Sequence, residues 1–168
     1  MTERSAAPGG LALIEALVNT VSLESGADTL DSAAGRAPFQ LTEADLDEAR
    51  ELRESLRATC LAHAGRPPHR PVTPLGALLA RAPLYVAVDP GDGSARLIPG
   101  DGGALLSRIA AAVAEAVTAG TWQRLKACEL PDCHWAYYDR SPAGRGRWCS
   151  MQVCGARAKM RRYRAKGA

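Results

Sequence analysis

The chain has 168 residues, of which 46% are hydrophobic and 5% aromatic, and its net charge is +3. That length suits one or two small domains, and no run approaches the roughly 18 apolar residues of a membrane span, so we expect no membrane contact. Residues 1–120 carry ten Arg and fifteen Asp or Glu, a balance of −5, whereas residues 121–168 carry eleven Lys or Arg and three Asp or Glu, a balance of +8. An acidic body with a basic tail indicates a regulatory or oligomerising domain joined to a module that binds a polyanion.

The N-terminal segment predicts a helix rather than an export signal. Glu3 offsets Arg4, and Glu15 interrupts the apolar stretch, so we expect a cytoplasmic protein. Residues 11–21 form the first predicted helix, because apolar residues recur there at helical spacing. They are Leu11, Ile14, Leu17, Val18 and Val21. Residues 22–38 are rich in turn-forming residues and predict a loop.

A longer helix is predicted over residues 42–64. Thr42 is a suitable N-cap residue, and acidic residues follow it in the first turn. The apolar stripe of this helix contains Leu46, Ala49, Leu52, Leu56 and Cys60. Because Cys60 lies far from the other cysteines, we expect it to be a packed core thiol. Gly65 and two prolines end the helix.

A small hairpin and another helix follow a proline-rich connection. Residues 75–80 predict a short helical segment, and the β-prone stretch Leu84–Val88 is joined by a turn to a returning strand at Arg96–Ile98. A further helical stripe ends near Gly120 and contains Leu105, Ile109, Ala112, Val113 and Val117. We therefore expect residues 10–120 to be a mainly helical domain with a small β-hairpin, able to fold alone.

Four cysteines near the C-terminus form a symmetric frame. They are Cys128, Cys133, Cys149 and Cys154, with the spacing C-x4-C, fifteen residues, C-x4-C. Two such pairs are typical of a tetrahedral zinc site, in which each chain reversal supplies two thiolates. The alternatives are disulfides or buried small apolar residues, and the x4 spacing is wider than the common x2. Disulfides require an oxidising compartment, so a cytosolic location favours one structural Zn²⁺.

The cysteine region predicts a small second module over residues 121–168. Segments 125–128 and 134–138 are candidate strands, and Ser150 is a candidate N-cap for a helix over 151–164. The second cysteine pair overlaps the first turn of that helix, as in treble-clef zinc folds, so the positive end of the helix faces the thiolates. The expected fold class is thus α+β, with a mainly helical N-terminal domain and a treble-clef-like zinc finger.

Basic residues beyond the finger are candidates for DNA contact. They are Arg145, Arg147, Arg157, Lys159, Arg161, Arg162 and Arg164. Helical spacing places Arg157, Arg161 and Arg164 on one face. Ala156, Met160 and Tyr163 form the stripe expected to point inward. Phosphate contact is the main expectation for the arginines, and Arg157 is also a candidate for reading a guanine.

The residues that follow Cys133 have two interpretations each. Trp135, Tyr137 and Tyr138 could stack on unpaired bases, but we expect at least two of them to form the small core of the module. His134 could be an alternative metal ligand, but four cysteines already complete a tetrahedron, so we expect it beside the site or at the surface.

The tail resembles the CGNR-type zinc finger of bacterial regulators. The resemblance rests on the four cysteines, on Arg147-Trp148-Cys149-Ser150-Met151 and on Cys154-Gly155-Ala156-Arg157 with the basic residues after it. The body is similar to the ABATE domain of stress-induced transcription regulators through Leu17-Val18-Asn19-Thr20, residues 51–58 and the helix before TWQRLKACELPDC. One position differs, because Ala156 stands where the family signature has Asn.

The resemblance implies a regulator whose body senses a small ligand. Asn19 and Arg53 are the candidate ligand-binding residues, but helix capping and ion pairs such as Arg50 with Glu54 explain such side chains more simply. No nucleophile–base pair, phosphate loop or open metal position appears, so we expect no enzymatic activity.

The leading interpretation is a DNA-binding transcriptional regulator with a structural zinc finger. The alternatives are an RNA- or single-strand-binding protein and a zinc-stabilised protein-interaction module. The candidate partners are double-stranded DNA, a small-molecule effector and a second copy of the chain.

Overall fold

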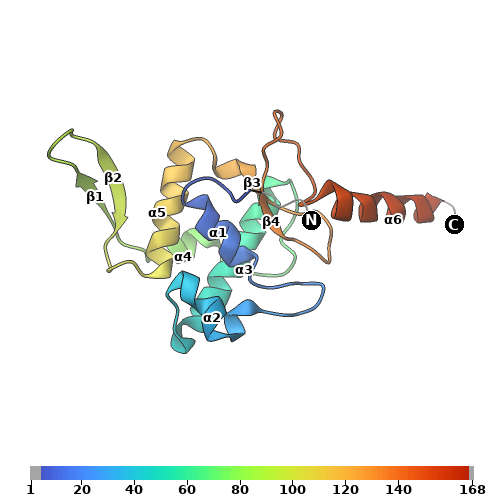
Figure 1. The fold of residues 1–168 in the computed structure, drawn as a ribbon, viewed down its shortest axis with the longest axis horizontal. Coiled ribbons are helices and arrows are strands. Elements are labelled where there is room, and N and C mark those ends of the chain that lie inside the picture. The colour runs from blue at the N-terminus through green and yellow to red at the C-terminus, as the bar shows by residue number, and fades with distance from the viewer. Residues whose placement is uncertain (1–4, 167–168) are drawn as a thin grey trace.

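The computed structural model describes residues 5–166. Its main elements are α1 (Leu11–Val18), α2 (Ala33–Arg36), α3 (Leu46–His63), α4 (Leu75–Leu79), β1 (Leu84–Val88), β2 (Ala95–Pro99), α5 (Leu105–Thr118), β3 (Leu125–Ala127), β4 (Ala136–Tyr138) and α6 (Ala156–Lys166). The strands form two antiparallel pairs, β1–β2 and β3–β4. Helices α1, α3 and α5 occupy the centre, the β1–β2 hairpin leaves one end, and α6 leaves the other (Figure 1). The predicted α+β class is confirmed.

The long helix α3 begins as its sequence predicts. Thr42 is the N-cap of a 3₁₀ turn, and Asp45 Oδ2 accepts a hydrogen bond from the Thr42 backbone N–H at 2.7 Å. The helix runs from Leu46 to His63 and ends before Gly65, whose φ of +71° lies in the left-handed region that glycine adopts easily. Its buried face includes Cys60, and burial raises the pKa of that thiol to about 12. The expectation of a packed core thiol is confirmed.

The segment after α1 is more ordered than predicted. Helix α1 ends at Val18 rather than at residue 21, because the chain turns there and Val21 forms an isolated bridge with Asp28. Instead of a loop, residues 29–39 form three short helical turns. Gly35 is required there, since a Cβ at that position would stand 1.9 Å from the carbonyl oxygen of Thr29. Local hydrogen bonds to short polar side chains, which periodicity does not reveal, hold these turns.

The finger's hairpin completes the core of the body. Leu125, Ala127 and Ala136, from β3 and β4, are buried in the same apolar cluster as residues of α1 and α3. Burying a leucine such as Leu125 contributes about 1.5–3 kcal/mol. The shared core argues against the expectation that residues 10–120 fold alone. A second, small cluster surrounds Cys128 and Cys154.

Helix α6 projects away from the body and buries none of its residues (Figure 1). Met160 is 52% exposed and Tyr163 is 76% exposed. The expectation that these two side chains point inward is therefore wrong, because α6 contacts the finger through Ala158, which packs against the cysteine cluster, and the stripe of Met160 and Tyr163 stays exposed. Within the same residues, no helix combines the length and apolar character needed to cross a membrane.

Candidate metal centre and nucleic-acid interface

The four cysteines of the predicted frame converge on one point. The Sγ atoms of Cys128, Cys133, Cys149 and Cys154 all lie within 4.8 Å of one another. The separations are 3.6 Å for Cys133–Cys149, 3.5 Å for Cys149–Cys154 and 3.7 Å for Cys133–Cys154. These distances are too long for disulfide bonds, whose sulfurs are about 2.0 Å apart. Four sulfurs held at such spacings outline the corners of a tetrahedron.

That tetrahedron fits zinc. A Zn–S distance of about 2.3 Å places the corners of a regular tetrahedron about 3.8 Å apart, close to the separations in this chain. Thiolate is also the ligand type of structural zinc sites, and four protein ligands leave no open coordination position. The cluster can therefore coordinate one zinc ion in a closed, structural site.

Two chain reversals position the sulfurs. Cys128 directly follows β3, and the backbone N–H of Cys133 donates to the carbonyl of Leu130 at 2.9 Å, which closes the first reversal. The second pair lies around a π-helical turn, Met151–Gly155, whose N-cap Ser150 accepts a hydrogen bond from the Val153 N–H. The predicted N-cap is confirmed, although the first turn of the predicted helix is π-helical rather than α-helical.

The electrostatics of the cluster favour a cation. Hydrogen bonds from Cys133 and Cys149 lower the pKa of Cys128 to about 2. Hydrogen bonding to Cys128 in turn raises the pKa of Cys133 to about 12 and raises that of Cys149. Without a cation the thiols thus compete for one negative charge. A divalent ion removes the conflict, since it stabilises all four thiolates together.

His134 lies beside the cluster and not among its ligands. Its Nδ1 is 2.9 Å from the carbonyl oxygen of Cys128, and its backbone has a φ of +43°. The Arg57 guanidinium donates to the carbonyl of His134 at 2.8 Å. The expectation that His134 sits next to the site is confirmed, and its carbonyl connects the finger to α3.

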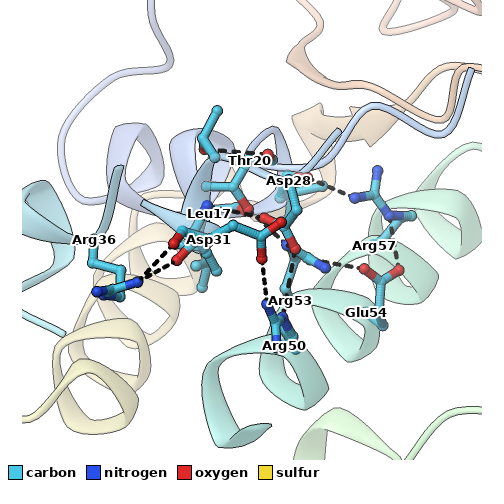
Figure 2. Close-up of polar contacts among 12 residues, drawn as sticks. Leu17, Thr20, Asp28, Asp31, Arg36, Arg50, Arg53, Glu54 and Arg57 are labelled. Carbon is cyan, nitrogen blue, oxygen red and sulfur yellow. Dashed lines mark hydrogen bonds and ion pairs between the residues drawn. The ribbon is translucent and has the colours of Figure 1, made fainter. Parts of the chain in front are cut away.

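A network of ion pairs lies between α3 and the segment after α1 (Figure 2). Arg53 donates to Glu54, to Asp28 at 2.7 Å and to Thr20 Oγ1 at 3.0 Å. Arg57, whose side chain is fully buried, donates to Glu54 at 3.0 Å and to the carbonyl of Val18 at 2.6 Å. Burial opposes ionisation of Glu54, but Arg57 and Arg53 outweigh it and hold the pKa of that carboxyl below its usual range. The network therefore stabilises a charged Glu54 inside the protein.

The two predicted ligand-binding residues both have protein partners. Arg53 belongs to the buried network and is not a surface ion pair. Asn19, the C-cap of α1, donates to the Ala136 carbonyl at 2.9 Å and accepts from the Ala136 N–H at 2.7 Å. Asn19 thus joins the body to the finger, Arg53 joins α3 to the segment after α1 within the body, and their binding of a ligand stays a prediction. Arg50 pairs with Asp31, at 2.6 Å, rather than with Glu54.

Some of the predicted DNA-contacting residues are paired with acidic side chains, and the others are exposed. Arg157 and Arg161 lie at the base of α6 and pair with Glu24, at 3.1 Å, and with Asp132, at 2.7 Å. The second group is exposed and contains Lys159, Arg162 and Arg164, for which no partner is seen within residues 5–166. Arg147 is paired with Glu129 at 2.7 Å, and Arg145 is exposed on the Gly-rich loop.

The aromatic residues of the finger are mainly structural. Tyr137 is 2% exposed, and Tyr138 packs against the main core while the Arg140 guanidinium lies 5.2 Å from its ring centroid. Trp135 is 40% exposed. Two of the three are thus packed inside the protein, but none belongs to the small cluster around the cysteines, so the expectation that they form the core of the module is wrong.

Sequence reasoning missed a buried ion pair between Lys126 and Asp139. Lys126 Nζ lies 2.9 Å from Asp139 Oδ2 and also donates to the Gly144 carbonyl. Burial raises the pKa of Asp139, but hydrogen bonds from Ser141 and Lys126 outweigh it and lower that pKa. Gly146 also donates to Asp139, and a Cβ there would stand 2.8 Å from the carboxylate. This pair fixes the Gly-rich loop.

Comparison with known protein families agrees with this geometry. The model of the CGNR zinc finger matches residues 124–167. The model of the ABATE family, whose description is "Putative stress-induced transcription regulator", matches residues 11–120. A comparison with curated proteins found no match.

Proposed function

Because the chain belongs to the ABATE family and ends in a CGNR zinc finger, we propose that it is a transcriptional regulator that binds double-stranded DNA through α6. The observation that carries the proposal is the free surface of this helix. Its eleven residues, ARAKMRRYRAK, contain six basic and no acidic side chains, and none is buried. A helix that is exposed over most of its surface and has this density of positive charge suits a polyanion groove.

The distribution of side chains around α6 suits a helix that lies in a DNA major groove. With 100° between successive residues, Ala156, Met160 and Tyr163 form one stripe. Arg157 and Arg164 border this stripe on one side, and Lys159 and Lys166 border it on the other. A B-DNA major groove accepts one helix between two rows of phosphates. The apolar stripe would face base edges, while the bordering cations contact phosphates on both strands.

The finger supports this helix at its base. The π-helical turn that carries Cys154 leads directly into α6, so the metal ion fixes the start of the helix. Arg157 and Arg161 add ion pairs that hold the first turns against Glu24 of the body and Asp132 of the finger. In the proposed complex, Arg162 and Arg164 contact phosphates, and Arg157 either contacts a phosphate or reads a guanine. The family Asn at position 156 is Ala here, so that side chain contributes no hydrogen bond.

In this proposal the zinc ion is structural, the protein acts in the cytoplasm, where its thiols stay reduced, and the body senses a small ligand near Asn19 and Arg53. A ligand there would replace the bonds from Asn19 to Ala136, which join α1 to β4. It would thereby change how the finger is held. A metabolite that raises the melting temperature of wild type, but not of Asn19→Ala or Arg53→Ala, would support this part. A shift that survives both substitutions places the ligand elsewhere.

Salt-dependent binding tests the DNA contact. Fluorescence anisotropy would compare duplex DNA, single-stranded DNA and RNA with wild type, Arg162→Ala, Arg164→Ala and the matched control Arg96→Ala on the hairpin. We expect tightest binding to duplex, and each α6 variant should lower the slope of log affinity against log salt by about one. The control should keep the wild-type slope. Preference for single strands would favour stacking by the exposed Tyr163, and unchanged slopes in both α6 variants would remove this helix as the DNA-binding surface.

A further inference from the structure

Both faces of the β1–β2 hairpin carry exposed apolar side chains, of which Val86 and Leu97 line a hollow shared with α5. Tyr85, Val86 and Val88 of β1 are 61%, 67% and 61% exposed, and Leu97 of β2 is 43% exposed. Strand β2 packs against α5, β1 is the outermost strand, and the tip of the hairpin projects away from the central helices (Figure 1). A two-stranded hairpin is marginal by itself, and further strands stabilise it.

The hydrogen-bond pattern shows which backbone groups of β1 point outward. Asp89 N–H donates to Ser94, and Gly100 N–H donates to Pro83, both at 2.8 Å. Because hydrogen-bonded pairs alternate along an antiparallel ladder, the backbone groups of Leu84, Val86 and Val88 point away from β2. The register of the hairpin is continuous, with no bulge. The outer edge of β1 therefore presents an uninterrupted row of donors and acceptors.

The two edges of the hairpin differ in their capacity to pair. The same alternation turns the backbone groups of Ala95, Leu97 and Pro99 outward on β2, and Pro99 has no N–H to donate. Leu84–Val88 contains no proline and no charged residue, the two devices that commonly protect an edge strand. The edge of β1 thus offers its full row of donors and acceptors, whereas the edge of β2 lacks one donor.

We propose that β1 pairs antiparallel with β1 of a second copy of this chain, which joins two hairpins into a four-stranded sheet. In the register centred on Val86, Val86 faces Val86 and Leu84 faces Val88. All three residues with outward backbone groups then find partners. The contact is isologous, so a two-fold axis closes it and no open edge of β1 remains.

Charge complementarity favours a second copy as the occupant. In this register Asp89 and Asp92, at the tip of one hairpin, lie beside the start of β1 in the other copy. Arg81 stands there, and its side chain is 57% exposed; it pairs with Glu48 at 3.3 Å, an exposed pair that contributes about 0–1 kcal/mol and so yields readily to an aspartate of the other copy. At each end of the contact, aspartates of one copy thus lie beside Arg81 of the other copy. Apolar pairs fill the middle. An unrelated strand would need the same arrangement.

Substitutions at Val86 test both the partner and the register. Since Val86 faces itself, Val86→Lys and Val86→Glu each place like charges directly opposite one another, which is unfavourable. In sedimentation velocity of the zinc-loaded full chain, we expect wild type to dimerise with rising concentration and each variant to stay monomeric. A mixture of the two variants should dimerise, because Lys then faces Glu. Native mass spectrometry would identify the mixed dimer by its mass.

Val117→Lys is the matched control, because it adds the same charge at another exposed valine, on α5, which is 57% exposed. It should dimerise like wild type. A mixed dimer would show that the hairpin is folded in both variants. The monomeric state of each single variant could then not be attributed to unfolding. A wild type that stays monomeric at every concentration overturns the proposal. So does dimerisation of the single variants, or a dimeric wild type combined with a mixture that forms no mixed dimer.

Discussion

Arg57 of α3 donates a hydrogen bond to the backbone carbonyl of His134, at 2.8 Å, one residue after the zinc ligand Cys133. The same guanidinium is fully buried and also donates to the Val18 carbonyl at the end of α1. One side chain thus joins the long helix, the first helix and the metal knuckle. Its positive charge is balanced inside the protein by Glu54.

Replacing Glu54 by Gln should destabilise the whole protein. The substitution leaves Arg57 and Arg53 buried without their shared carboxylate, and breaking a buried pair in this way costs about 3–5 kcal/mol. Urea unfolding at pH 7 measures the loss. Glu48→Gln is the control, since Glu48 forms an exposed pair with Arg81 at 3.3 Å, and surface pairs contribute about 0–1 kcal/mol. A loss for Glu54→Gln as small as that of the control contradicts the prediction.

The Glu54 contribution also has a defined pH dependence. The pKa of Glu54 is lower in the folded chain than in the unfolded chain, where it is about 4.3. Its stabilisation is therefore fully present above pH 4.3 and is lost as the pH falls through the folded-state pKa. The stability difference between wild type and Glu54→Gln should narrow on acidification, and urea titrations at stepped pH would show this. A difference that widens would have the wrong sign.

Cys149→Ser should remove zinc and unfold only part of the finger. A structural zinc site supplies the folding free energy of the small cluster around it. Residues 149–166 should lose protection in hydrogen exchange, whereas β3 and β4 should keep it, because Leu125 and Ala136 belong to the main core. Elemental analysis should find one zinc ion per wild-type chain and per Cys60→Ala control. Protected amides in α6 of the Cys149→Ser variant would mean that the metal does not hold this helix.

Two truncations should have opposite outcomes. A chain that stops at residue 120 loses Leu125, Ala127 and Ala136 from the shared core, so we expect a large fall in melting temperature and binding of a dye for exposed apolar surface. A chain that stops at residue 155 loses α6, which has no fully buried residue and touches the small cysteine cluster through Ala158, and should melt near the wild-type temperature. Equal melting temperatures for both truncated chains would show that the core is not shared.

Asp132→Asn should strengthen binding to DNA. Asp132 Oδ2 accepts from Arg161 at 2.7 Å, so a phosphate must compete with this carboxylate. Exposed pairs contribute about 0–1 kcal/mol, which corresponds to an affinity gain of up to about fivefold. Glu24→Gln should act in the same direction through Arg157. Anisotropy titrations at one salt concentration measure both variants, with Asp47→Asn at an exposed position of α3 as the control. Weaker binding by both would show that these pairs position the helix for DNA rather than compete with it.

The sequence was most informative where a local pattern carries the chemistry. Spacing alone identified the four zinc ligands, and capping residues placed the starts of α3 and of the turn at Ser150. It was silent on contacts between distant residues, such as Asn19 with Ala136 and Lys126 with Asp139, because no periodicity relates their positions. It misplaced Met160 and Tyr163 for a related reason: a stripe of apolar residues is the same whether the helix lies on a core or projects from it.

The shared core limits how the finger can be reused. If residues 121–168 were fused to another protein without the body, Leu125, Ala127 and Ala136 would form an exposed apolar surface prone to aggregation. The finger is therefore not an independently folding module that can be transferred to another protein. Helix α6 is less constrained, because none of its side chains is fully buried and Ala158 is the one that packs against the cysteine cluster within residues 5–166. A change in DNA specificity is therefore more readily obtained by substituting exposed residues of α6 than by exchanging the whole finger.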